Sequence, residues 1–163
     1  MSADPNDLLQ QLVDRQQIVD LVHAYCRNVD LVNAAEVAAL FTDDCVVDYG
    51  PGLGEPTRGS AQLEDRLARG LPRFAATSHH VSNIDITFDI TPDGPDAADG
   101  VTYLYAWHRF PDHPATPDAH LWGQYHDRFI RTAAGWRIAT RTLRVAGQEA
   151  FDVAWYPIGR RSG

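Results

Sequence analysis

The order of the predicted elements indicates an α+β fold, with helices in the first half of the chain and strands in the second. Residues 8–29 place apolar side chains three to four positions apart, which is typical of an amphipathic helix. After residue 84 the period changes to two, as in a strand with one buried face. The 163 residues, 44% of them hydrophobic, suit one domain with a sizeable core. We therefore expect residues 1–163 to form a single α+β domain.

Three helices are expected before the strands. The first has one apolar stripe, formed by Leu8, Leu12, Ile18, Val19, Val22, Tyr25, Cys26 and Val29. A second covers residues 34–41 and ends in the acidic turn 42–44, and a strand over 45–49 and a loop over 50–54 follow. The third begins with Ser60 as its N-cap. Its apolar face is Leu63, Leu67, Leu71 and Phe74.

Four strands are expected in the second half, over residues 84–90, 100–110, 120–132 and 136–145. Residues 91–95 form a turn, and residues 133–135 close a tight hairpin. The loop over 111–118 contains three prolines. It is either a flap over a pocket or a plain surface loop.

Composition excludes several classes of function. The net charge of −8 disfavours nucleic acid and anionic membranes as partners, because both select basic surfaces. All fourteen basic residues are arginine, so Schiff-base lysine chemistry and a P-loop are excluded. No apolar run approaches the ~20 residues that span a bilayer, and no signal peptide is visible, so we expect a cytoplasmic protein. Cys26 and Cys45 are expected in the core rather than in a disulfide.

Six groups of residues, in this order along the chain, resemble the SnoaL-like, nuclear-transport-factor-2-like superfamily. They are Ile18-Val19-Asp20-Leu21 with Tyr25 and Asp30, Leu40-Phe41-Thr42-Asp43-Asp44, Arg58-Gly59, Thr77-Ser78-His79-His80 with Ser82-Asn83, Gly123-Gln124-Tyr125, and Gly135-Trp136-Arg137-Ile138. The resemblance implies a cone-shaped, curved antiparallel sheet, mixed in part. Three N-terminal helices would enclose one apolar pocket with it. It also implies no cofactor, as is usual in the superfamily.

Within the superfamily, the chain is similar to the branch of scytalone dehydratase, hexachlorocyclohexane dehydrochlorinase and bile-acid 7α-dehydratase. That branch shares an Asp at the end of the first helix and a His at the start of a strand, and Asp30 and His79 occupy these places. Tyr25 and Tyr49 resemble pocket tyrosines of the branch. The resemblance also matches His108 to a second histidine of scytalone dehydratase, and Tyr125 stands where that enzyme has a pocket Asn.

These residue types suit an elimination without a metal. Imidazole is a good general base near neutral pH, a carboxylate on its other nitrogen fixes the tautomer, and phenols stabilise a developing oxyanion. One obstacle is the alternation of side chains along a strand. His79 would point to the opposite face from Ile84 and Ile86, unless a bulge precedes Ile84. The other readings are that His79 is a satisfied structural histidine, that Asp30 caps the second helix, and that Tyr25 is core packing.

Two further residues are candidates for substrate binding. Arg141 would bind a substrate carboxylate or orient Asp30, or else be an exposed strand charge. Trp122 would be a pocket wall or ordinary core. No metal site is expected, because the chain has no HxH, HExxH or Cys-pair motif.

The resulting hypothesis is a lyase or dehydratase that acts, without a cofactor, on a hydrophobic cyclic hydroxy or keto compound, such as a steroid or polyketide. His79 is the expected base, Asp30 its partner, and Tyr25 and Tyr49 the hydrogen-bond donors. An isomerase or cyclase that uses the same dyad is the alternative enzyme. A non-catalytic structural or binding subunit of the same fold is the third possibility.

We predict that the chain forms a homotrimer, with a homodimer as the alternative. If His108 faces the pocket, the alternation of residues 101–110 turns Tyr103, Tyr105 and Trp107 outward, and an exposed aromatic patch of that size marks an interface. Sedimentation equilibrium at micromolar concentration measures this. A clean species of the 18.1 kDa chain mass would contradict the interface.

Overall fold

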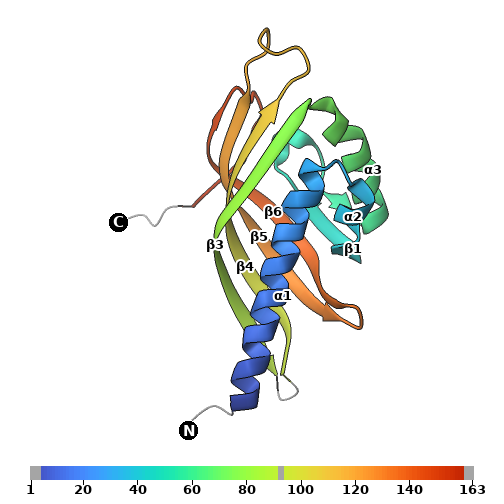
Figure 1. Ribbon diagram of the computed structural model, residues 1–163, viewed down its shortest axis with the longest axis vertical. Coiled ribbons are helices and arrows are strands. Elements are labelled where there is room, and N and C mark those ends of the chain that lie inside the picture. Colours follow the sequence, from blue (N-terminus) through green and yellow to red (C-terminus); the bar gives the residue numbers. More distant parts are fainter. Residues whose placement is uncertain (1–4, 92–93, 160–163) are drawn as a thin grey trace.

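The computed structural model describes residues 5–91 and 94–159 (Figure 1). Its helices are α1 (Pro5–Asp30), α2 (Ala34–Ala38) and α3 (Ser60–Gly70), with short 3-10 turns at Pro51–Leu53 and Leu71–Arg73. The strands are β1 (Phe41–Asp48), β2 (Thr57–Arg58), β3 (Ala76–Thr91), β4 (Gly94–Arg109), β5 (Ala119–Thr132), β6 (Gly135–Glu149) and β7 (Tyr156–Pro157). None of the helices in this part of the chain is long and apolar enough to cross a membrane.

The strands form one curved, open, mixed sheet in the order β2-β1-β6-β5-β4-β3, with β7 beside β6. The pairs β1–β6 and β6–β7 are parallel and the other pairs are antiparallel. The predicted α+β class with a curved mixed sheet and three helices is confirmed. The predicted hairpin at 133–135 is also present, since Thr132 pairs with Gly135 across the turn.

Helix α1 lies across the concave face of the sheet, and α2 and α3 cover one end of it (Figure 1). The second half of α1 supplies the stripe predicted from the sequence, with Ile18, Val22, Tyr25 and Val29 all buried in the core. The first half differs, since Leu8 is 49% and Leu12 is 65% exposed. Burial on α1 begins only at Asp14, so the predicted stripe is wrong over the first two turns.

A bulge in β3 decides which way its side chains point. His79 pairs with Ala106 of β4 and Ile86 with Gly100, so the eight residues 79–86 of β3 lie opposite the seven residues 100–106 of β4, and the register shifts between Val81 and Ile84. The extra residue reverses the alternation. Ile86 is therefore buried on the same face as His79. The bulge that the sequence analysis required before Ile84 is present.

Several predicted boundaries are wrong. The predicted acidic turn 42–44 lies inside β1, where the pairing with β6 is irregular between Phe41 and Val46, and the side chains of Asp43 and Asp44 are exposed. Gly59, and not Ser60, is the N-cap of α3, because the chain reaches the helix with a positive φ of 86° at Gly59. The short strands β2 and β7 were not predicted. Residues 92 and 93 of the predicted turn 91–95 lie outside the described residues.

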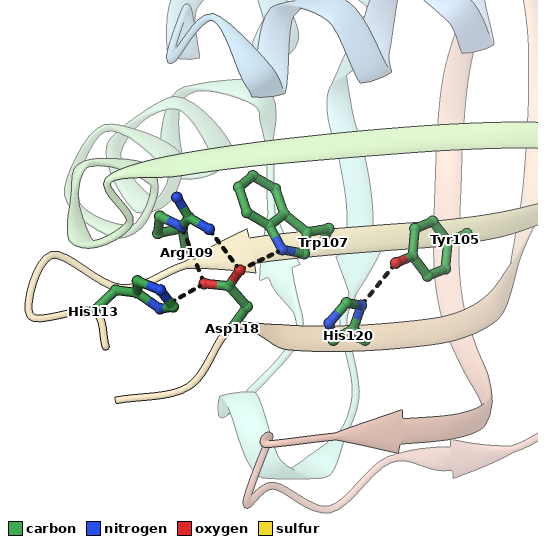
Figure 2. Close-up of polar contacts among 6 residues, drawn as sticks. All are labelled: Tyr105, Trp107, Arg109, His113, Asp118 and His120. Carbon is green, nitrogen blue, oxygen red and sulfur yellow. Dashed lines mark hydrogen bonds and ion pairs between the residues drawn. The ribbon is translucent and has the colours of Figure 1, made fainter. Parts of the chain in front are cut away.

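The outer face of the sheet carries aromatic side chains, as the alternation along β4 predicts. Tyr103 is 47% exposed, and Tyr105 donates or accepts a 2.7 Å hydrogen bond with Nδ1 of His120 (Figure 2). Nearby, the Asp118 carboxylate accepts hydrogen bonds from Trp107 and Arg109, and His113 lies 3.2 Å from it. Asp118 thus ties the loop before β5 to the end of β4, which favours a fixed surface loop over a flap.

Candidate functional site

A pocket of about 680 Å³ lies between the concave face of the sheet, α1 and α3. This volume is within the range that holds a small organic molecule. Its lining is predominantly apolar and comes from Val29, Leu53, Leu67, Leu71, Phe74, Leu104, Ala106, Phe110, Leu121, Leu143, Phe151, Val153 and Trp155. Five of the residues predicted for the site also line it, namely Tyr25, Tyr49, His79, His108 and Tyr125.

The side chain of Asp30, at the end of α1, accepts three hydrogen bonds from the start of β3. The Thr77 hydroxyl donates to Oδ1 at 2.8 Å, the backbone N–H of His79 donates to Oδ2 at 2.9 Å, and Nδ1 of the His79 ring lies 2.6 Å from Oδ1. The predicted hydrogen bond between Asp30 and His79 is therefore present. Asn33, and not Asp30, is the N-cap of α2, so the reading of Asp30 as a helix cap is wrong.

The carboxylate determines the tautomer of the His79 ring. Burial raises the pKa of Asp30, but the hydrogen bonds from the His79 ring, the His79 backbone and Thr77 lower it by more, so the pKa lies below its usual value. An ionised carboxylate only accepts hydrogen bonds, and Nδ1 must therefore be the donor. In the neutral ring this leaves the lone pair on Nε2. His79 can thus act as a base toward a molecule in the pocket that its ring lines.

Two tyrosines share a hydrogen bond across the pocket wall. The hydroxyls of Tyr25 and Tyr49 are 2.9 Å apart. Because one hydroxyl donates to the other, the acceptor of the pair keeps its own proton for a ligand. Burial, together with the neighbouring Tyr25, raises the pKa of Tyr49 well above its usual value, so the Tyr49 hydroxyl stays protonated and serves as a donor rather than as a base.

Arg141 supports the tyrosines from within the core. It is fully buried, and its Nε and Nη2 donate to the two carboxylate oxygens of Asp127 at 2.8 and 2.7 Å. Its guanidinium carbon lies 4.0 Å from the ring centroids of both Tyr25 and Tyr125. The prediction that Arg141 contacts substrate or Asp30 is corrected here. Arg141 does not line the pocket, and it forms its ion pair with Asp127.

His108 is the second histidine of the pocket, and its ring meets that of His79 edge-on at 5.3 Å. Burial, and then the neighbouring His79, lower the pKa of His108 to about 4. Its buried Nδ1 has no hydrogen-bond partner among the described residues. His108 is therefore a neutral imidazole at neutral pH, able to hydrogen-bond a ligand.

Trp122 does not belong to this pocket. It lines a separate groove of about 350 Å³ with His80, Tyr103 and Tyr105 on the outer face of the sheet, and it is 39% exposed. Residues 120–125 alternate, and Leu121 and Tyr125 take the inner face. The prediction of Trp122 as part of the substrate site is corrected for this reason.

Sequence reasoning missed two parts of the site. The hydroxyl of Thr77 was not predicted as a donor to Asp30, and the available signal was its position two residues before His79, on the same side of the strand. The segment 151–155, which follows β6, contributes Phe151, Val153 and Trp155 to the pocket wall. Its docking needs a glycine on the facing turn, since a Cβ at Gly52 would lie 2.5 Å from the Ala154 nitrogen.

Metal binding has no candidate in the part of the chain that the structure describes, where no three His, Cys, Asp or Glu residues gather closely enough to hold an ion. The two cysteines are buried and unbonded to each other. The pocket brings together the His79 imidazole with its carboxylate partner, the second imidazole of His108 and the phenols of Tyr25 and Tyr49.

Comparisons with known proteins match this architecture. The model of the SnoaL-like domain family matches residues 10–142. An uncharacterised protein of Mycobacterium tuberculosis is 28% identical over 131 residues, which cover 80% of this chain and 84% of that protein.

Two solved structures share this fold. A scytalone dehydratase-like protein of Novosphingobium aromaticivorans is 32% identical with a TM-score of 0.82, over 93% of this chain and 97% of that one. A hexachlorocyclohexane dehydrochlorinase, LinA-type3 of Novosphingobium barchaimii, has a TM-score of 0.75 over 92% of this chain and 99% of that one. Its identity is only 18%, so this second likeness is one of fold alone.

Because the pKa of Asp30 is lowered in the folded state, the free energy of unfolding is expected to depend on the ionisation of this carboxylate. The ionised carboxylate stabilises the folded state fully above the unfolded pKa of about 3.9, and this contribution is lost as the pH falls through the lower folded pKa. We expect Asp30→Asn to reduce the free energy of unfolding most above pH 4, and the difference from wild type to shrink toward pH 2. Urea denaturation across this range measures it.

Asp20→Asn is the matched control, since Asp20 is exposed on the same helix. A difference between wild type and Asp30→Asn that stays constant from pH 7 to pH 2 would contradict the assignment of an ionised, hydrogen-bonded Asp30.

Proposed function

The chain belongs to the SnoaL-like domain family, and from that premise we propose that it is a dehydratase-type lyase that needs no cofactor. Its relatives include a scytalone dehydratase-like protein and dehydrochlorinases, all of which bear names of elimination enzymes. The proposed substrate is a hydrophobic cyclic hydroxy or keto compound, because the pocket wall is mostly hydrocarbon and holds a molecule of that size.

One observation carries the proposal. Nδ1 of His79 is 2.6 Å from the Asp30 carboxylate, and the ring lines the apolar pocket. When a histidine acts as a base, a carboxylate hydrogen-bonded to its second ring nitrogen stabilises the imidazolium that forms. A purely structural histidine needs no such exposure to a pocket.

The proposed reaction begins when Nε2 of His79 takes a proton from a carbon beside the substrate carbonyl. The electrons of the C–H bond move into the carbonyl, and negative charge develops on its oxygen. When that enolate collapses, a C=C bond forms and the bond to the β-hydroxyl breaks. The imidazolium then returns its proton to the departing hydroxide, so that the products are water and the unsaturated ketone and His79 is neutral again.

The hydroxyls of Tyr25 and Tyr49 are the proposed donors to the developing oxyanion. Both line the same pocket as His79, and the raised pKa of Tyr49 keeps its hydroxyl protonated. If the substrate lacks a leaving group, the same enolate is reprotonated at another carbon, which is an isomerisation. The elimination and the isomerisation thus share their first step, and a test of that step addresses both.

We predict that the protein catalyses exchange of α-protons in cyclic ketones. In D2O, a panel that includes 2-decalone and steroid 3-ketones is expected to take up deuterium faster with the protein than with buffer alone. His79→Ala is expected to lower this rate by ~10²–10⁴-fold, the usual contribution of a general base. Mass spectrometry measures the deuterium content.

His80→Ala is the matched control, because His80 is the next residue on β3 and lines the outer groove instead. Asp30→Asn is expected to slow exchange as His79→Ala does, since the ring loses the partner that fixes its tautomer. Equal rates in wild type and His79→Ala, or no exchange with any ketone of the panel, would count against the proposed base.

Removal of one phenol tests the oxyanion donors. Tyr49→Phe is expected to slow exchange by about 10²-fold with little change in KM, because the hydroxyl acts on charge that develops only in the transition state. Tyr103→Phe, on the outer face, is the control. A loss in KM alone would assign Tyr49 to ground-state binding and contradict its proposed role.

A further inference from the structure

The charged side chains that line the pocket are all of one sign. Among the described residues, the lining contains three formal charges, those of Arg66, Arg69 and Arg73, and no carboxylate. All three come from α3 and the 3-10 turn that follows it, at a spacing of three and four that places them on one face. This is unusual in a chain whose net charge is −8.

Arg66 is held in place by groups that leave its charge uncompensated. Its Nη2 donates to the Leu53 carbonyl at 2.8 Å, and its Nη1 donates to the Thr57 hydroxyl at 2.9 Å and to the Glu55 carbonyl at 3.3 Å. None of these three acceptors carries a formal charge. The guanidinium also lies 5.2 Å from the centroid of the Tyr49 ring, so its positive charge is directed toward the pocket wall.

Arg69 and Arg73 stand farther out and are more accessible. Arg69 has an ion pair with Asp65 at 3.9 Å, but both side chains are about three-quarters exposed, so the pair is weak and readily exchanged for another anion. Arg73 makes no ion pair within residues 5–91 and 94–159. Two accessible guanidinium groups thus line the pocket beyond its apolar walls.

We propose that the substrate is an amphipathic anion, whose apolar ring system fills the pocket and whose oxyanion is bound by Arg69 and Arg73. The proposal rests on the proposed function and specifies its substrate class. A guanidinium presents a planar pair of N–H donors that matches a carboxylate or a sulfonate. The positive rim also concentrates anionic ligands at the mouth of a protein that otherwise repels them.

Two fluorescent probes of the same skeleton test the proposal. 8-Anilinonaphthalene-1-sulfonate carries a sulfonate, and N-phenyl-1-naphthylamine has the same rings without it. We expect the anionic probe to bind the wild-type protein more tightly. In Arg69→Gln/Arg73→Gln its dissociation constant should rise about tenfold, while that of the neutral probe stays within twofold, because only charge contacts are lost. Arg66 is kept, since it also holds Leu53 and Thr57.

The control is Arg27→Gln/Arg58→Gln, which makes the same change in net charge at exposed arginines outside the pocket lining. A second control, Ala106→Phe, places a ring at a pocket-lining position beside His79 and is expected to weaken both probes. The proposal is overturned if both arginine pairs weaken the anionic probe equally, if neither does, or if Ala106→Phe leaves the anionic probe unaffected.

This experiment is independent of catalysis. If the probes behave as expected but His79→Ala exchanges ketone protons as wild type does, the anion-binding pocket stands and the lyase function fails. If exchange depends on His79 but Arg69→Gln/Arg73→Gln has no effect on either probe, the lyase function stands and the proposed substrate class fails.

Discussion

The site depends on the three hydrogen bonds that the Asp30 carboxylate accepts from β3. They connect the last residue of α1 to residues 47 and 49 positions later, so one side chain fixes both the angle at which the helix meets the sheet and the orientation of the His79 ring. One of the donors is the backbone N–H of His79, so this hydrogen bond does not depend on the rotamer of the His79 side chain. The helix can then present Tyr25 to the pocket while Asp30, five residues on and about 140° around the axis, faces β3.

The bulge in β3 is the second constraint, and it separates two chemical environments. Before it, His79 faces the pocket and His80 faces the outer groove, and after it Ile84 and Ile86 pack on the inner side. Without the extra residue, a strand that buries its isoleucines would turn His79 outward. Burial of the isoleucines and exposure of His79 to the pocket would therefore need opposite alternations along a regular strand, and the one extra residue of β3 allows both.

The fold was predictable from the sequence wherever it follows from local periodicity. The 3.6-residue stripe of Ile18, Val22 and Val29 and the two-residue alternation around Ile86 reflect helix and strand geometry themselves. The predictions failed where a distant partner decides. The residues 42–44 resemble a turn, but Phe41 and Val46 on either side of them pair with β6, nearly a hundred positions later, and the segment between is part of β1. Arg141 and Trp122 were misplaced for the same reason, because their faces are set by the registers of β5 and β6.

The pocket wall contributed by residues 151–155 is attached to the molecule in a different way from the dyad. It meets the turn at Pro51–Leu53 through a hydrogen bond from Gly52 to Ala154 and continues into the two-residue strand β7. Phe151, Val153 and Trp155 thus shape the pocket wall from outside the β3–β4 ladder that holds His79. Under the proposed function, a change of sequence in this segment would alter the shape of the space offered to a substrate while the strand pairing that places His79 stays as it is.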